Sequence, residues 1–329
     1  MNIGDILMLL ISLIVFPGLI FISASSLFTE WFIRKVTARI QNRMGPSYTG
    51  PFGILQPFID FIKLIGVKEL KLQRYSSTML AGLGLLMAIG ALVSSLLLLP
   101  ISIVRIQAPY DVIVLIYLTV VWTLIGLIIA ALSYPNPFTI AGVSRMLALA
   151  TFVEPAWVVA LLVPFIATSK LYNCSYSVLC TSRYTLSILG INPLYILPYI
   201  LGIIAILVAS QAKLMYKPFD IPEAEQELIS GHITEFSGPV LALYNLAHDI
   251  ETTVIALIVV YIYLGGPYPY PHLSVPGALL LIIKYFIIVT IITIIRSVFG
   301  RFRIDDAIRS IIKYSLTISI IALILSWIM

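Results

Sequence analysis

Residues 78–101 read TMLAGLGLLMAIGALVSSLLLLPI, a run of 24 positions without a charged side chain. A transmembrane helix needs about 20 mostly apolar residues to cross roughly 30 Å of hydrocarbon. Seven other segments are apolar over a similar length. We therefore predict an all-α integral membrane protein with about eight transmembrane helices, placed near Ile6–Phe32, Thr78–Ile101, Val112–Ser133, Met146–Ala167, Pro193–Tyr216, Pro239–Leu264, Val275–Ile295 and Ile311–Trp327.

The composition agrees with this prediction. Of the 329 residues, 60% are hydrophobic and 11% are charged, whereas a soluble domain carries about 25% charged residues. These values exclude a water-soluble enzyme, a disordered tail and a nucleic-acid-binding protein, and they favour one polytopic membrane domain over residues 1–329. Two cysteines and three histidines argue against an iron–sulfur or zinc centre, so we expect no metal in this chain.

Basic residues indicate the orientation, because cytoplasmic loops carry an excess of Lys and Arg. Sixteen of the twenty Lys and Arg residues fall in or beside the loops at about 34–77, 134–145, 217–238 and 296–310. Three lie on the opposite side, two of them in the loop at about 168–192. We therefore predict that the four basic loops are cytoplasmic and that both termini face the outer side of the cell (plasma) membrane. Cys174 and Cys180 lie in the outer loop, where the sequence is compatible with a disulfide bond and with two free thiols.

The first cytoplasmic loop contains two motifs with turn-forming Gly-Pro pairs. RIQNRMGP occupies residues 39–46, and GPFGILQP occupies residues 50–57. In the segment that follows, the polar residues Gln56, Asp60 and Lys63 recur at helical spacing with apolar residues between them. This pattern predicts a short amphipathic helix in the membrane interface. The alternative is a surface helix that only anchors the loop.

The third cytoplasmic loop is rich in carboxylates and reads KPFDIPEAEQEL at residues 217–228. Pro222 predicts the start of a helix that Asp220 caps, since acids in a first turn suit the helix dipole. In such a helix, Asp220, Glu223 and Glu227 share one face, where clustered carboxylates can share protons. This arrangement is what the entrance of a proton path requires. The alternative is a solvated acidic loop that docks a basic partner.

Several ionisable side chains fall inside the predicted spans, where a charge at the bilayer centre costs about 2.5–3.5 kcal/mol on insertion scales. Glu154 lies in the fourth span, His248, Asp249 and Glu251 lie in the sixth, and Lys284 lies in the seventh. His248 and Glu251 share a helix face. Such residues normally face the interior of a bundle and mark an ion path. The alternative is an internal salt bridge, for example between Lys284 and one of these acids.

With these motifs, the chain resembles the family of NADH:quinone oxidoreductase subunit 1, a membrane subunit of respiratory complex I. Relatives of that family occur in membrane-bound [NiFe] hydrogenases and related archaeal complexes. The likeness spans nearly the whole chain and is most specific in residues 39–46, 50–63 and 218–238. It implies a subunit with no redox centre or catalytic group of its own, which joins a peripheral redox arm to antiporter-like membrane subunits. Iron–sulfur clusters, with nickel–iron in hydrogenase-type complexes, would belong to the large and small subunits of that arm.

The resemblance also implies two sets of functional residues. The docking set, which would hold the arm, comprises Arg34, Lys35, Arg39, Gln41, Asn42, Arg43, Asp60 and Lys63. The ion-coupling set would connect the redox event to a buried chain of ionisable groups through Glu154. Its members are Glu154, Asp220, Glu223, Glu225, Glu227, Glu235, His248, Asp249, Glu251 and Lys284.

Two departures from the complex I pattern bear on quinone binding. Complex I members usually have Glu-Arg-Lys where this chain has Ile33-Arg34-Lys35, and Ala-Glu-Tyr where it has Ala247-His248-Asp249. These differences weigh against a quinone site and leave the ion-coupling role intact. We therefore expect the membrane subunit of a hydrogenase-type or related archaeal complex, which couples the arm to proton or sodium translocation. The alternatives are the quinone-chamber subunit of a complex I-like dehydrogenase and a stand-alone secondary transporter.

Overall fold

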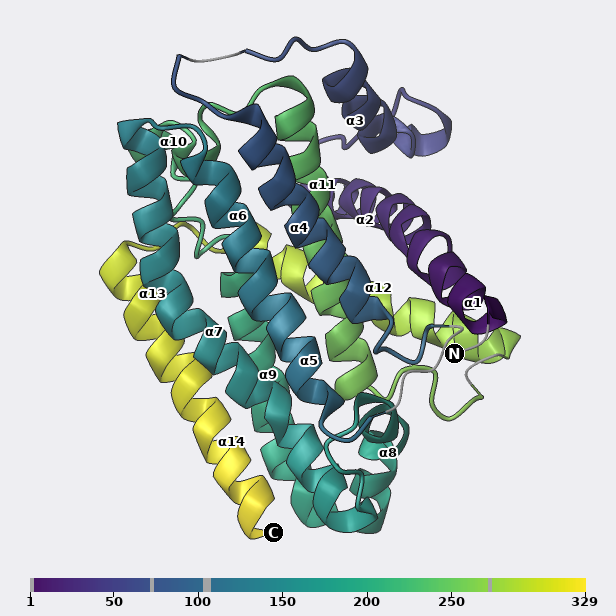
Figure 1. Cartoon of the computed structure of the whole chain (residues 1–329). Coiled ribbons are helices and arrows are strands. Elements are labelled where there is room, and N and C mark those ends of the chain that lie inside the picture. Colours follow the sequence, from purple (N-terminus) through teal and green to yellow (C-terminus); the bar gives the residue numbers. More distant parts are fainter. Residues whose placement is uncertain (1–2, 72–73, 103–107, 272–273) are drawn as a thin grey trace.

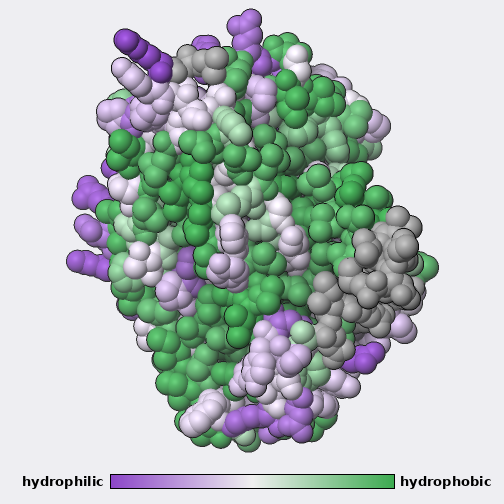
Figure 2. Space-filling view, in the orientation of Figure 1, coloured by the Kyte–Doolittle hydropathy of each residue, from purple (hydrophilic) through white to green (hydrophobic). Residues whose placement is uncertain are grey.

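The computed structural model describes residues 3–71, 74–102, 108–271 and 274–329. Every regular element in these ranges is helical, which confirms the predicted all-α class (Figure 1). Eight helical segments within them are long and apolar enough to cross a membrane. Figure 2 shows hydrophobic residues over most of one face, with hydrophilic residues gathered toward its two ends and its left edge. The chain is a multi-pass membrane protein.

The helices are labelled in chain order in Figure 1. Their bounds are α1 (Ile3–Ile14), α2 (Leu19–Ile40), α3 (Gln56–Gly66), α4 (Thr78–Leu96), α5 (Asp111–Ile116), α6 (Thr123–Leu132), α7 (Pro137–Tyr172), α8 (Val178–Ile191), α9 (Ile196–Lys213), α10 (Glu225–Leu228), α11 (Gly238–Ile262), α12 (Val275–Val298), α13 (Ile304–Ser310) and α14 (Thr317–Ile328). π-Helical turns at Tyr117–Trp122 and Ile311–Leu316 join α5 to α6 and α13 to α14.

Several helices extend further than the hydropathy of the sequence predicts. α2 continues to Ile40 and α7 begins at Pro137, so parts of the predicted first and second loops are helical. The side chain of Asn136 caps α7 at its start. The last span begins at Ile304. The reason is that an apolar run marks the part of a helix that suits lipid and carries no information about a polar extension of the same helix.

α11 is the central helix of the bundle and packs against α2, α3, α4 and α12. The chain from Ile250 to Tyr263 is buried without a break. α7, α9 and α14 form a second group of helices packed on one another. α4 and α6 cross closely at Gly84 and Gly126, where a Cβ on either glycine would lie 2.6 Å from the carbonyl oxygen of the other. Glu154, Lys213 and Glu251 lie where the groups around α11 and α7 meet.

The bundle has two different ends, which we name the α3 end and the α8 end. The predicted amphipathic helix is present as α3, which lies at the top of the bundle in Figure 1 and packs against α2 and α11. The opposite end carries α8 and the C-terminus of the chain. A disulfide bond joins Cys174 to Cys180 just before α8 and within its first turn. Of the two alternatives that the sequence left open, a disulfide bond and two free thiols, the structure has the disulfide bond.

Residues 214–237 connect α9 to α11 at the α3 end without the predicted helix. In this stretch, which is described throughout, the regular elements are the four-residue α10 and a single 3₁₀ turn. The chain turns at Glu223, and the Asp220 carboxylate lies 2.7 Å from Arg301 instead of capping a helix. The prediction that Asp220, Glu223 and Glu227 share a helix face is therefore wrong. A cation from a distant segment provides a stronger partner for Asp220 than the backbone N–H groups of a first turn.

Candidate functional site

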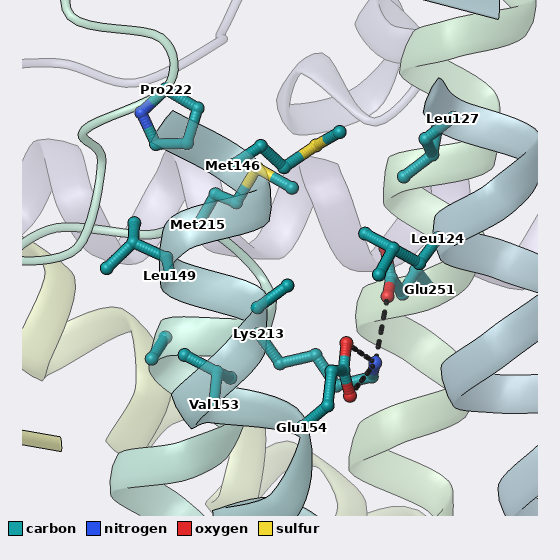
Figure 3. A pocket seen from close by; sticks show the side chains of 12 residues that line it. Leu124, Leu127, Met146, Leu149, Val153, Glu154, Lys213, Met215, Pro222 and Glu251 are labelled. Carbon is teal, nitrogen blue, oxygen red and sulfur yellow. Dashed lines mark hydrogen bonds and ion pairs between the residues drawn. The ribbon is translucent and has the colours of Figure 1, made fainter. Parts of the chain in front are cut away.

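Three helices place one ammonium group between two carboxylates in the interior of the bundle. Lys213 Nζ lies 2.7 and 2.8 Å from the two carboxylate oxygens of Glu154 and 3.9 Å from Glu251 Oε1 (Figure 3). The side chains of Lys213, Glu154 and Glu251 are 2%, 14% and 6% exposed. Buried charges require partners of opposite sign. Because this cluster has two carboxylates for one ammonium, it has the capacity to take up one proton.

Local packing fixes the position of Lys213. It is the last residue of α9, and its ammonium lies 5.6 Å from the centre of the buried Trp157 ring. A pocket of about 20 Å³ adjoins the cluster, which is room for about one water molecule. The remaining lining of this small pocket is apolar and comes from Leu124, Leu127, Met146, Leu149, Ala150, Val153, Ala212, Met215 and Pro222 (Figure 3).

A second, larger cavity of about 400 Å³ borders the small pocket, because Met215 lines both. Charged side chains dominate its lining. Four acids and four cations face it, namely Glu30, Asp220, Glu223, Asp249, Arg34, Lys217, Arg296 and Arg301. A lining with as many acidic as basic side chains suits water and ions. The Met215 side chain separates this cavity from the small pocket beside the buried cluster.

Ion pairs order the large cavity. Arg301 Nη2 lies 2.7 Å from Asp220 Oδ2, and Arg34 Nε lies 2.7 Å from Glu30 Oε1. Burial raises the pKa of Asp220, and the adjacent Arg301 offsets part of that shift. Asp220 therefore binds a proton at a higher pH than an exposed aspartate does.

His248 and Asp249 continue the row of ionisable groups along α11. Both line the large cavity, and His248 Nε2 lies 3.0 Å from the carbonyl oxygen of Leu214, the residue after Lys213. Glu251 lines the small pocket instead. The two residues share a face of α11, as predicted, since they lie three positions apart in one continuous helix, and their side chains reach neighbouring cavities.

The acids of the third loop bind different partners. Glu223 lines the large cavity and accepts a 2.5 Å hydrogen bond from the hydroxyl of Tyr244. Glu227 pairs with Arg145 of α7 and is 57% exposed. The two carboxylates therefore have separate environments, and Glu223 alone of this pair faces a cavity.

Glu235 accepts a hydrogen bond from the side chain of Asn136, the residue that caps α7. The side chain of Glu225 falls outside the described part of the chain. Within the described ranges, no group of three or more His, Cys, Asp or Glu side chains is arranged to hold a metal ion. The chemistry that the residues of the two cavities offer is the binding and release of protons.

Known proteins match this chain over most of its length. A family model described as NADH dehydrogenase matches residues 11–327. The chain is also 33% identical over 251 residues to a subunit of the NADH-quinone oxidoreductase of Thermomicrobium roseum, a match that covers 73% of each protein. This chain belongs to the NADH dehydrogenase family of complex I membrane subunits. The family resemblance predicted from the loop motifs is confirmed.

The fold of this family member also matches a solved structure, that of the membrane-bound sulfane sulfur reductase, an archaeal respiratory membrane complex. The two chains superpose with a TM-score of 0.77 at 26% sequence identity, over 98% of this chain and 100% of the other. The matches in sequence and in structure identify this chain as a membrane subunit of a multisubunit, redox-driven respiratory complex.

Lys284, a predicted member of the ion-coupling set, lies apart from both cavities. Its Nζ donates hydrogen bonds of 2.7, 2.8 and 3.0 Å to the carbonyl oxygens of Leu264, Gly266 and Tyr268. These residues follow α11 at the α8 end, where Gly265 packs against α8. The alternative of a salt bridge between Lys284 and an acid of the spans is therefore wrong, and the lysine closes the turn after α11.

The docking set lies along the end of α2, the loop that follows it and α3. Arg34 lies 2.7 Å from Glu30 and 3.0 Å from Asp60, while Lys35 Nζ donates to the carbonyl oxygen of Pro46. These contacts hold the loop against α2. The remaining members of the set are exposed and comprise Arg39, Gln41, Asn42, Arg43 and Lys63.

Sequence reasoning missed Lys213 and Tyr244 as site residues, together with the cavity cations Arg296 and Arg301. It counted Lys213 among the basic residues of a cytoplasmic loop. A signal was present, because Lys213 falls inside the predicted span Pro193–Tyr216, where a lysine without a carboxylate partner is costly. Tyr244 gave no signal, since an aromatic residue in a span is common.

Proposed function

We propose that this subunit couples electron transfer in docked subunits to the translocation of protons or sodium ions. The observation that carries the proposal is the Glu154–Lys213–Glu251 cluster beside a cavity lined by eight charged side chains. A passive anchor has no use for such groups, because desolvating each buried ion is unfavourable by several kcal/mol. The cost of keeping them in an apolar bundle favours a functional role.

The geometry supports coupling through charge. The ammonium of Lys213 is closer to Glu154 than to Glu251, so a shift toward Glu251 would release Glu154 to accept a proton. A change of charge in the large cavity acts on this balance across Met215, which borders both cavities. Two positions of one lysine give two states, and a redox event needs only to change their relative populations.

The α3 end suits the docking of the electron-transfer arm. Tyr48, Met44 and Phe52 are 98%, 85% and 77% exposed in the loop between α2 and α3, beside the exposed members of the docking set. Large apolar side chains exposed next to charged ones mark interaction surfaces. We assign this end to hydrogenase-like large and small subunits that hold the iron–sulfur clusters. Antiporter-like membrane subunits would pack against the flank of the bundle.

A quinone fits the large cavity poorly. Binding sites for organic ligands are lined mainly by apolar side chains with a few polar groups, whereas eight charged side chains line this cavity. The proposal therefore places no quinone in this cavity, and electrons pass between cofactors of the partner subunits.

The distribution of charge supports an orientation in the plasma membrane. The loops that gather at the α3 end carry most of the basic residues of the chain, and such loops face the cytoplasm. We therefore assign the α3 end to the cytoplasm and both termini to the outside. Labelling of a cysteine introduced at Tyr48 by an impermeant maleimide, in membrane vesicles of known sidedness, tests this assignment.

The test of the proposed function uses the whole complex, purified with its partner subunits and reconstituted in liposomes. Electron transfer and ion uptake measured on the same vesicles give the number of ions moved per electron. Glu154→Gln should lower this ratio about tenfold, which is the factor that corresponds to a typical coupling free energy between sites. Electron transfer should continue. Removal of sodium and addition of a protonophore identify the ion.

Glu227→Gln is the matched control, because Glu227 is an exposed carboxylate outside both cavities. This variant should keep the wild-type ratio. A wild-type ratio in Glu154→Gln, or no ion movement by the unmodified complex during electron transfer, would contradict the proposed function.

A further inference from the structure

A buried histidine lies beside Glu223 and is absent from the lining of both cavities. His232 belongs to the 3₁₀ turn after α10, and its side chain is 0% exposed. Its Nε2 lies 2.9 Å from the hydroxyl of Tyr244, which donates a 2.5 Å hydrogen bond to Glu223 Oε1. Since the single proton of Tyr244 points to Glu223, His232 Nε2 is the donor of the other bond. The three groups form a continuous hydrogen-bonded row.

The other ring nitrogen of His232, Nδ1, is also buried. It makes no hydrogen bond to a side chain of the described residues, and the backbone of Pro222 lies close enough to raise the pKa of the ring. A neutral imidazole that carries its proton on Nε2 has a lone pair on Nδ1, so this atom can accept a proton, and the carbonyl oxygen of Pro222 can then accept a hydrogen bond from it.

The position of His232 depends on a glycine in α7. A Cβ at Gly142 would lie 2.5 Å from the backbone nitrogen of His232, so only glycine allows the turn to approach α7 this closely. Pro222 and Glu223 are neighbours in the chain but line different cavities, Pro222 the small pocket and Glu223 the large cavity. Tyr244 also lines the large cavity, so the row runs from the buried ring of His232 to the edge of that cavity.

We propose that His232 is a proton-transfer residue that passes a proton to Glu223 through Tyr244. In this step the Nε2–H bond of the imidazolium breaks and an O–H bond forms on Tyr244. The original O–H bond of Tyr244 breaks at the same time, and an O–H bond forms on the Glu223 carboxylate. His232 ends neutral, Glu223 ends as a neutral acid, and Tyr244 is unchanged. One proton moves from the buried ring to the edge of the large cavity without displacement of a heavy atom.

The groups around the ring set the pH range of the step. Burial lowers the pKa of His232, the Glu223 carboxylate 3.8 Å away raises it, His248 lowers it and the backbone of Pro222 raises it. The hydroxyl of Tyr244 faces Nε2, and on α7 the cation Arg145 is already bound to a carboxylate of the same loop. The ring is therefore neutral at neutral pH and releases a proton readily after it has accepted one.

The first experiment, which rests on the proposed ion translocation, measures ions moved per electron in the reconstituted complex as a function of pH. His232→Gln keeps an N–H donor for Tyr244 but has no titrating nitrogen. Tyr244→Phe keeps the ring and removes the hydroxyl. Both variants should lower the ratio about tenfold and lose its dependence on pH below about 6.5. Tyr263→Phe is the matched control, because it removes a buried hydroxyl that binds the carbonyl oxygen of Ala160 away from the row, and it should behave as the wild type.

The second experiment requires no ion transport and therefore separates this inference from the proposed function. Isotope-edited infrared spectroscopy of labelled histidine in the resting complex should show a signal that His232→Gln removes and that Tyr244→Phe shifts. A titrating signal in a complex that moves no ions would reject the proposed function and retain the relay. A His232 signal that does not titrate between about pH 4 and pH 9 would overturn the relay. The relay would also be overturned if His232→Gln and Tyr244→Phe both moved the wild-type number of ions per electron.

Discussion

Two lysines in the apolar helices meet opposite kinds of partner. Lys213 binds the carboxylates of Glu154 and Glu251, whereas Lys284 donates three hydrogen bonds to backbone carbonyl oxygens after α11. Both arrangements satisfy an ammonium group away from bulk water. They differ in what they can do, because a carboxylate binds a proton near neutral pH in a suitable environment and a backbone carbonyl does not.

This difference teaches that an ionisable residue in a membrane span is not by itself evidence for an ion path. The partners decide its role. At the α3 side of the bundle, titratable partners gather around two adjoining cavities. At the α8 end, the corresponding features are a disulfide bond and a capped turn, which stabilise the fold. The contrast between Lys213 and Lys284 can be tested directly.

The largest effect is expected from Lys213→Met, which keeps an apolar stem and removes the charge. Removing one partner of a buried ion pair costs about 3–5 kcal/mol, so the thermal unfolding midpoint of the purified complex should fall, as should the ions moved per electron. Lys213→Met combined with Glu154→Gln should regain part of the stability, because one carboxylate remains without a cation instead of two. A double variant no more stable than the single one would show that the pair is not coupled.

The next effect in size is expected from Lys284→Met, which removes three hydrogen bonds at the α8 end. A hydrogen bond to a charged group contributes about 1.5–3 kcal/mol, and the neighbouring carbonyls can recover part of the loss from water. Thermal stability should fall by an amount in this range, while the surviving complex moves the wild-type number of ions per electron. A lowered ratio would place Lys284 in the ion path and remove the contrast with Lys213.

Much of the fold was predictable because lipid imposes a simple requirement. A spanning helix must be apolar along its length, so the eight segments are visible in one dimension, and α3 is visible from the spacing of Gln56, Asp60 and Lys63. The end of α2 and the start of α7 were not predictable, because the sequence of a polar helix extension resembles that of a loop. The helix expected at Pro222 failed because Asp220 finds its partner, Arg301, 81 positions away in the sequence.

In the buried cluster, the two carboxylates were predicted from the sequence and the lysine between them was not. Glu154 and Glu251 are conspicuous in apolar sequence, because a carboxylate in a span is costly. Their cation gave a weaker signal, since Lys213 falls inside a predicted span but lies at its end, where lysines are common, and its pairing depends on the packing of three helices. His232 was missed for a related reason: one histidine in a polar loop predicts nothing until Gly142 of α7 is seen to bury it.

A smaller effect that depends on pH is expected at Asp220. Burial raises the pKa of Asp220 above the ordinary value of about 3.9, with Arg301 offsetting part of the shift. Between the ordinary and the raised pKa, the folded chain binds more protons than the unfolded chain, so the free energy of unfolding falls as pH rises through that window. Asp220→Asn should remove this slope. Unfolding measured for both proteins from about pH 4 to pH 7 checks it, and equal slopes would contradict the assignment.

The smallest effect is expected at the Arg145–Glu227 pair, which ties α10 to α7 outside both cavities. The side chains are 29% and 57% exposed, and exposed ion pairs contribute about 0.2–1 kcal/mol. Glu227→Gln should therefore change thermal stability by about 1 kcal/mol or less and leave ion movement per electron as in the wild type. Glu223→Gln, in the same loop but facing the large cavity, should lower that ratio instead. If Glu227→Gln lowered the ratio as much as Glu223→Gln, the exposed edge of the third loop would transmit the redox signal, and the partner of a carboxylate would no longer be a sufficient guide to its role.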